Sequence, residues 1–168
     1  MKVALDTNLI VRLIIDGDEP QVDQVEQLLD IADEIFIPVI TFCEVVRVLK
    51  RAYKMPAPTI ATALRSIANI QSLTFDRPAL EAGLQMLDLG GDFADGCVMF
   101  EARRAKCDRL ATFDKTFVAL SDGFASLPDV LKSQSPAPSF RPSIRFRFWT
   151  AAPEAPLPRL SSRATRRT

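Results

Sequence analysis

The sequence contains no histidine, although it is 168 residues long. Without histidine the chain has no imidazole base, no Ser–His or Cys–His nucleophile pair, and none of the histidine ligands of common zinc sites. The chemistry that remains for an enzyme of this composition uses carboxylates and a divalent cation with oxygen ligands.

Cysteines and long apolar runs are also scarce. The three cysteines, Cys43, Cys97 and Cys107, show no paired spacing, which predicts reduced, buried thiols in a cytoplasmic protein. No stretch approaches the roughly 18 apolar residues of a membrane span. Asp6 interrupts the first apolar run too early for a secretory signal. We therefore expect a cytoplasmic protein that does not enter a membrane.

Positive and negative charges are equal in number but are segregated along the chain. Residues 1–132 hold 14 Lys and Arg against 20 Asp and Glu, a net charge of −6, whereas residues 133–168 have a net charge of +6. This asymmetry predicts a folded acidic domain at 1–132 and a basic tail at 133–168.

The tail is rich in Pro, Ser and Arg and lacks helical or strand periodicity, so we expect it to be disordered. Within it, the segment Arg145–Trp149 alternates cations with aromatic rings. Such a pattern suits single-stranded nucleic acid, which binds through stacking and charge. The alternative, which we favour, is an appended segment without a specific role.

Short apolar strands alternate with helices along residues 1–132. The predicted strands are residues 2–5, 34–38, 72–75, 109–112 and 124–127, and the predicted helices are residues 7–15, a second helix from residue 18, and 40–53, 59–69, 78–87 and 93–105. This alternation predicts an α/β fold with a mostly parallel sheet.

Four acidic residues, Asp6, Glu44, Asp95 and Asp114, lie where the predicted elements should bring them to one edge of the sheet. Asp6 and Asp114 end predicted strands, and Glu44 and Asp95 lie near the starts of predicted helices. Open α/β sheets bind ligands at the carboxyl edge, so the fold is expected to bring these acids together. A cluster of carboxylates is costly unless a cation lies among them, and a divalent metal ion is the usual cation.

Each acid also has a simpler explanation. Asp6 and Asp114 precede predicted helices, where aspartate is a favoured N-cap. Asp92 and Asp95 lie three apart at a helix start, where both could be solvated first-turn acids. Glu44 lies among apolar neighbours and could pair with Arg47, one turn further along the helix.

The order and context of the acids resemble those of a known family. The segments LDTN, TFCEVVRVL, DFADG and ATFDKTF match the acidic signature of the PIN-domain ribonucleases, and most closely the VapC-type toxins of bacterial toxin–antitoxin pairs. The resemblance runs from about Lys2 to Val130. It implies a three-layer α/β/α domain with a mostly parallel central sheet.

The resemblance also implies roles for individual residues. It makes Asp6, Glu44, Asp95 and Asp114 the metal-binding and catalytic acids, with Glu44 acting directly or through water. Asp92, Thr112 and Asn8 are predicted to support the site. Gly96 departs from the pattern, because the family usually has alanine there, and glycine weakens a helix by up to about 1 kcal/mol.

We therefore predict an endoribonuclease that depends on Mg²⁺ or Mn²⁺. The resemblance further implies the toxin of a toxin–antitoxin pair, a homodimer, and a small antitoxin protein as partner. One alternative is a PIN-like module that binds RNA or protein without cleaving. Another is a phosphatase of the haloacid-dehalogenase type, which would want aspartate where this chain has Asn8.

Contact with RNA requires local positive charge, because the predicted domain is acidic. Two groups of cations lie downstream of the acids on predicted helices: Arg47, Lys50, Arg51 and Lys54, and then Arg103 and Arg104. They are predicted to contact the RNA backbone, which positions a substrate without specifying its sequence. The alternative for each is a solvated helix face.

Overall fold

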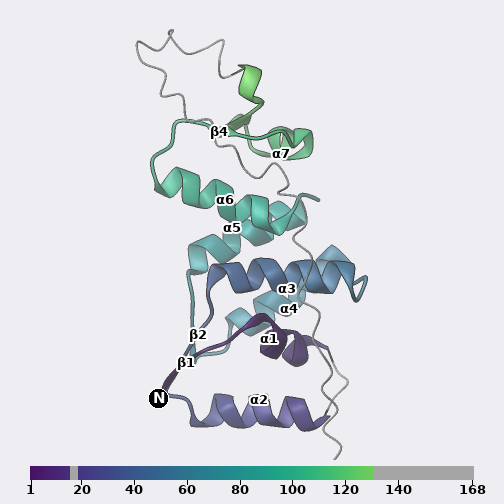
Figure 1. The fold of residues 1–168 in the computed structure, drawn as a ribbon, viewed down its shortest axis with the longest axis vertical. Coiled ribbons are helices and arrows are strands. Elements are labelled where there is room, and N and C mark those ends of the chain that lie inside the picture. The colour runs from purple at the N-terminus through teal and green to yellow at the C-terminus, as the bar shows by residue number, and fades with distance from the viewer. Residues whose placement is uncertain (16–18, 131–168) are drawn as a thin grey trace, which may run out of the picture. The chain divides into compact units, whose positions relative to one another are not determined.

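The computed structural model describes residues 1–15 and 19–130, so the predicted tail at 133–168 lies outside the described residues (Figure 1). In chain order the elements are β1 (Lys2–Ala4), α1 (Thr7–Ile14), α2 (Glu19–Ile31), β2 (Glu34–Phe36), α3 (Val39–Arg51), α4 (Ala57–Ala68), β3 (Leu73–Thr74), α5 (Arg77–Asp88), α6 (Phe93–Arg104), β4 (Leu110–Ala111), α7 (Lys115–Leu120) and β5 (Ala125–Ser126). The fold is α/β with parallel strands, as predicted.

The first sheet has the order β1-β2-β3 and presents two different faces. Successive side chains of a strand point to opposite faces, and Leu5, Ile35, Ile37 and Leu73 are buried on one of them. The opposite face is more open and carries Lys2, Ala4, Glu34, Phe36 and Thr74. On that face Lys2 forms an ion pair with Glu34 (2.7 Å), and the Thr74 hydroxyl donates to the same carboxylate (3.0 Å).

The main core lies between the buried sheet face and five helices, α1, α3, α4, α5 and α6. Its largest fully buried side chains include Phe42 and Leu49 from α3, Ile60 and Leu64 from α4, and Leu80 and Leu84 from α5. Phe42 also packs edge-to-face against Phe75, with ring centroids 5.5 Å apart. Helices thus cover the apolar face of the sheet, while polar side chains on the opposite face bond to one another.

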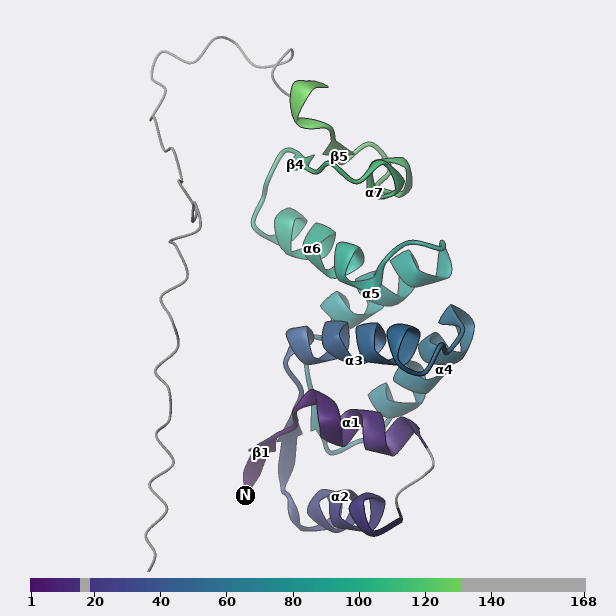
Figure 2. The ribbon, with the colours of Figure 1, turned by 45° about the vertical axis from the view of Figure 1, so that its right-hand side comes forward.

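The last two strands form a separate sheet. β4 and β5 pair in parallel, with Leu110 opposite Ala125, and α7 connects them (Figure 2). Phe117 and Ala125 are buried here, and the Ser121 hydroxyl accepts from the Ala125 backbone N–H (2.9 Å). The strands therefore do not form the single central sheet that the sequence predicted, because in the described residues β1 and β4 do not pair with each other.

Helices α5 and α6 cross closely at two glycines. A Cβ atom at position 96 would lie 2.3 Å from the backbone oxygen of Ala82, and one at position 83 would lie 2.6 Å from the Phe93 ring. Both glycines are buried. The glycine at position 96 thus has a packing reason: an alanine would force the two helix backbones apart.

Two further predictions can be compared with the structure. All three cysteines are free, but only Cys97 is buried. Cys43 is half-buried and Cys107 is exposed, so the prediction of buried thiols was wrong for Cys107, which follows the exposed end of α6. Within the described residues, no helix has the length and apolar character needed to cross a membrane.

Candidate active site

Asp6 follows β1 and caps α1. Its Oδ1 atom accepts from the backbone N–H groups of Asn8 (3.0 Å) and Leu9 (3.3 Å). These donors would otherwise lack partners in the first helical turn. The other carboxylate oxygen makes no hydrogen bond to a described residue. The cap therefore fixes the carboxylate and leaves one oxygen free, so capping and ligand binding are compatible at Asp6.

Asp114 plays the same structural part after β4. Its Oδ1 accepts from the backbone N–H groups of Thr116 (2.7 Å) and Phe117 (3.0 Å), and it begins α7. The Thr112 hydroxyl in turn accepts from the Asp114 backbone N–H (3.0 Å). Thr112 thus holds the loop that presents Asp114.

Asp92 and Asp95 lie at the start of α6. Asp92 is the N-cap and accepts from Ala94 N–H (2.9 Å), while Asp95 lies in the first turn and is half-buried. The pKa of Asp95 is raised above its ordinary value, first by burial and then by the negative charges of Asp92 and Asp114. Two carboxylates, Asp92 and Asp114, are therefore close enough to Asp95 to disfavour its charged form.

Glu44 projects from the second turn of α3 and forms an ion pair with Arg47 (2.5 Å), the partner that the simpler explanation named. The same two side chains line a groove with Asp92 on α6, and Lys50 and Arg51 lie further along it. The groove therefore joins two of the acids to three cations. Its positive side is formed by one face of α3.

Behind this groove, Cys43 and Cys97 join α3 to α6. The interaction of the two thiols is the largest cause that lowers the pKa of Cys43 and raises that of Cys97. The Cys97 thiol donates its single proton to the backbone oxygen of Ala79 (3.5 Å). These contacts fix the helices that carry Glu44 and Asp95.

The structure brings together some of the predicted acids and not others. Asp92 links two groups, because it shares the groove with Glu44 and acts electrostatically on Asp95, together with Asp114. Asp6 does not contribute to the raised pKa of Asp95. Among the described residues, no three Asp, Glu, Cys or His side chains are placed to hold one metal ion.

The predicted RNA-binding cations differ in their surroundings. Arg47, Lys50 and Arg51 line the groove. Lys54 lies beyond the end of α3, in a left-handed backbone conformation with φ of 53°. Arg103 stacks over the Phe124 ring (4.9 Å), and Arg104 pairs with Asp76 (2.5 Å) and Glu101 (3.0 Å). The two arginines of α6 therefore already have partners within the fold.

Comparison with known proteins identifies the family. The PIN domain matches residues 3–122, which include all four predicted acids. The chain belongs to the PIN domain family. No curated protein gives a match to the sequence. PIN domains are generally nucleases that use divalent metal ions, so the family supports a nuclease-like fold and a hydrolase.

Two features of this PIN domain were not fully predicted from local sequence. Asp92 was predicted only to support the site, yet it is the acid that connects α3 to α6. A cavity lined by Asn8, Arg12, Gln21 and Gln24 was not predicted at all. The sequence feature that could have indicated this cavity is Arg12, the one cation in the helix sequence TNLIVRLI.

Proposed function

We propose that this PIN domain is a metal-dependent endoribonuclease that hydrolyses RNA phosphodiester bonds. The observation that carries the proposal is the electrostatic action of Asp92 and Asp114 on the half-buried Asp95, with Glu44 in the adjoining groove beside Asp92. Carboxylates whose charges oppose one another are stabilised when a cation binds between them. The family supports the same general chemistry.

The donor set fits Mg²⁺ or Mn²⁺, because hard divalent cations prefer carboxylate oxygens. Asp6, Asp95 and Asp114 would hold the ion directly, and Glu44 directly or through water. When bound, such an ion neutralises phosphate charge and lowers the pKa of a bound water. The caps made by Asp6 and Asp114 orient both carboxylates in advance, since each uses only Oδ1 for its helix.

The four acids can act as one site only if Asp6 approaches the others. β1 and β4 are each paired on one side only within the described residues, so each has an edge that can accept another parallel strand. Pairing of these two edges would join the sheets and place the residues after β1 and β4 next to each other. We propose that the protein forms its active site through this pairing of β1 with β4, which we call the closure.

The substrate would lie along the groove of α3. Lys50 and Arg51 are available for phosphates, whereas Arg47 would have to exchange Glu44 for the substrate. Lys54, Arg103 and Arg104 remain proposed contacts, although use of Arg104 would cost its two ion pairs. The polar contacts predicted here position an RNA without reading its sequence.

The catalytic proposal is tested with single-stranded RNA and purified protein. Cleavage should require Mg²⁺ or Mn²⁺ and stop with EDTA, and Asp95→Asn should reduce it by orders of magnitude. Asp6→Asn and Asp114→Asn should act similarly while keeping their caps, because asparagine caps a helix about as well as aspartate. Asp23→Asn on the exposed face of α2 is the matched control. Cleavage by Asp95→Asn at the wild-type rate would contradict the proposed site.

The biological role that we propose is the toxin of a VapC-type toxin–antitoxin pair, acting in the cytoplasm as a homodimer. This role is supported by the resemblance of the four acidic segments to those of the VapC-type toxins. Expression alone should arrest bacterial growth, Glu44→Ala should be tolerated, and co-expression of the adjacent small reading frame should restore growth. Harmless expression of folded, RNase-active protein would remove the toxin role and leave the nuclease. RNA binding without cleavage would instead favour the non-catalytic module.

A further inference from the structure

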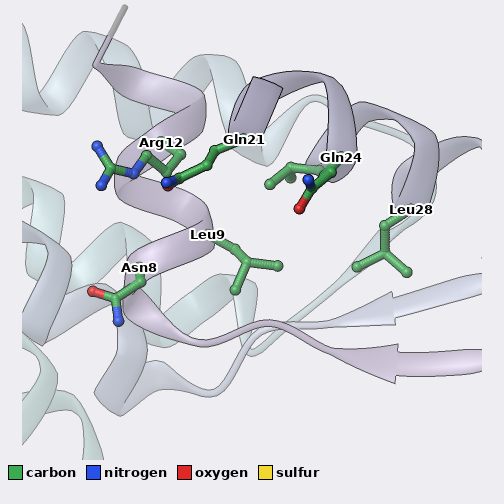
Figure 3. A pocket seen from close by; sticks show the side chains of 7 residues that line it. Asn8, Leu9, Arg12, Gln21, Gln24 and Leu28 are labelled. Carbon is green, nitrogen blue, oxygen red and sulfur yellow. The ribbon is translucent and has the colours of Figure 1, made fainter. Parts of the chain in front are cut away.

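A cavity of about 840 Å³ lies between α1 and α2, outside the acidic groups described above (Figure 3). This volume falls in the range of roughly 300–1,000 Å³ that is usual for small-ligand pockets. Asn8, Leu9 and Arg12 reach it from α1, and Gln21, Gln24, Val25 and Leu28 reach it from α2. The lining therefore combines one cation, three amides and an aliphatic wall.

Arg12 gives the cavity its charge. Its side chain is half-buried on the last turn of α1, and it forms no ion pair with any residue of the described ranges 1–15 and 19–130. Partial burial of an unpaired guanidinium is unfavourable unless an anion approaches. The forked donors of arginine suit the oxygens of a phosphate.

The three amides give the cavity donors and acceptors. None of the side chains of Asn8, Gln21 and Gln24 makes a hydrogen bond to a described residue. A primary amide offers N–H donors and a carbonyl acceptor together, which matches the edge of a nucleobase. Leu9 and Leu28 supply an apolar surface of the kind on which the flat face of a base can lie.

The position of the cavity connects it to the candidate active site. Asn8 lines the cavity, and its backbone N–H is bonded to the Asp6 carboxylate at 3.0 Å. A nucleotide bound here would therefore lie beside the Asp6 end of the site. The groove of α3 that holds Lys50 and Arg51 is a separate surface.

We propose that the cavity between α1 and α2 binds one nucleotide of single-stranded RNA next to the cleaved bond, with its phosphate on Arg12 and its base edge on Gln21 and Gln24. This inference rests on the proposed nuclease function and adds base selection to it. The cation and amides favour RNA over a protein segment, which would dock mainly through apolar contacts.

The test measures binding of a short single-stranded RNA of mixed sequence in EDTA, where cleavage cannot interfere. Arg12→Gln should weaken binding roughly tenfold, the equivalent of about 1.4 kcal/mol. Arg65→Gln, which removes the same charge from α4, should stay within about twofold of wild type. Equal affinities of Arg12→Gln and Arg65→Gln would overturn the proposal.

Base selection is tested by recovering bound sequences from a randomised RNA pool. Gln24→Ala should abolish a base preference at one position, and Gln27→Ala, an exposed neighbour outside the cavity, should keep it. Gln24 is exposed, so its replacement should leave the fold intact. Identical sequence preferences for both variants would overturn base readout by this cavity.

The two proposals can fail separately. If wild type binds RNA through Arg12 but never cleaves it, the nuclease proposal fails and the nucleotide site stands. If wild type cleaves and the cavity variants bind and cleave as wild type does, the nucleotide site fails. Loss of a co-expressed partner protein by Arg12→Gln, with RNA binding unchanged, would identify a protein-binding site and overturn the proposal.

Discussion

The regions before and after the Gly90–Gly91 turn differ in how they are stabilised. Residues 2–88 form a three-stranded sheet and supply four of the five helices around one large core, to which α6 adds Phe93 and Cys97. After α6, the chain has two strands of two residues each, a six-residue helix and a few buried side chains such as Phe117 and Ala125. Asp95 and Asp114 both lie after Gly91, but Asp95 is on α6, whose Phe93 and Cys97 belong to the large core.

This difference between the two regions predicts which one is rigid and which one is mobile. A region with few buried apolar contacts opens more readily than a large core. The second region is joined to the first mainly by the crossing of α5 and α6 at Gly83 and Gly96. The large core thus supports Asp95, while the part of the chain after α6 carries Asp114, the acid that must move for the proposed closure.

The largest expected effect compares two buried phenylalanines. Phe42→Ala removes a fully buried ring from the large core and should lower the free energy of unfolding by about 3–5 kcal/mol. Phe117→Ala should cost less, because Phe117 lies outside that core. Denaturant unfolding measures the loss, and hydrogen exchange should show that Phe117→Ala loses protection mainly within residues 110–126. If both variants lost hydrogen-exchange protection equally and throughout the domain, the two regions would unfold as one cooperative unit.

The next effect concerns the helix crossing. Gly96→Ala should gain up to about 1 kcal/mol in helix propensity but lose roughly 1–3 kcal/mol through overpacking against the Ala82 backbone, so we expect net destabilisation. Gly83→Ala should lower the free energy of unfolding by less, because its added methyl meets a side chain, the Phe93 ring at 2.6 Å, whereas that of Gly96→Ala meets a helix backbone at 2.3 Å. Thermal unfolding compares the two variants, and a higher melting temperature for Gly96→Ala would show that the crossing is not tight.

A smaller effect concerns the pH dependence of stability in EDTA. The pKa of Asp95 is higher in the folded protein than its ordinary value of 3.8, so the folded state binds this proton more tightly. Stability is therefore lost as the pH rises from 3.8 through the raised pKa. Asp95→Asn should raise the melting temperature near neutral pH, on the order of a degree or two.

This gain of Asp95→Asn should disappear when the pH falls below the ordinary pKa of aspartate. There the Asp95 carboxyl group of the wild type is protonated in both the folded and the unfolded state. Added Mn²⁺ should reverse the order of the two proteins, because only the wild type keeps the full set of acids. A constant difference in melting temperature across the pH range would show that Asp95 titrates normally.

The smallest effect is expected at the ion pair of Glu44 and Arg47. Both side chains are substantially exposed, so Arg47→Gln should change the free energy of unfolding by less than about 1 kcal/mol. Arg65→Gln, which breaks the exposed pair with Asp88, serves as control. A much larger loss for Arg47→Gln would show that the groove contributes to the folded core as well as to binding.

Most elements could be predicted from local sequence, and the misses have physical reasons. The helix beginning after Asp92 and the strand at Glu34–Phe36 were both predicted to within two residues. Helix α7 was missed because six residues give too little periodicity, although Asp114 had been recognised as a possible cap. Cys107 was expected to be buried, since a sequence does not show which side of a loop faces solvent.

The candidate site was predictable only in part. The residue types and the caps follow from local sequence, because a helix N-terminus needs acceptors wherever it lies. The approach of Asp92 to Glu44, and the cavity around Arg12, join different helices and leave little trace in local periodicity. The reason for Gly96 was likewise hidden, since the atom that excludes a side chain belongs to Ala82 on another helix.

Periodicity and capping act within a few residues, so the alternation of strands and helices, the parallel α/β class and the acids at element boundaries could be deduced from the amino-acid sequence. The pairing of the strands in two sheets, β1–β3 and β4–β5, emerged only in the folded structure. The same is true of the charges that raise the pKa of Asp95, which are those of Asp92 and Asp114. Strand pairing and the electrostatic surroundings of a carboxylate depend on residues distant in sequence, whose positions are fixed by packing of the whole core.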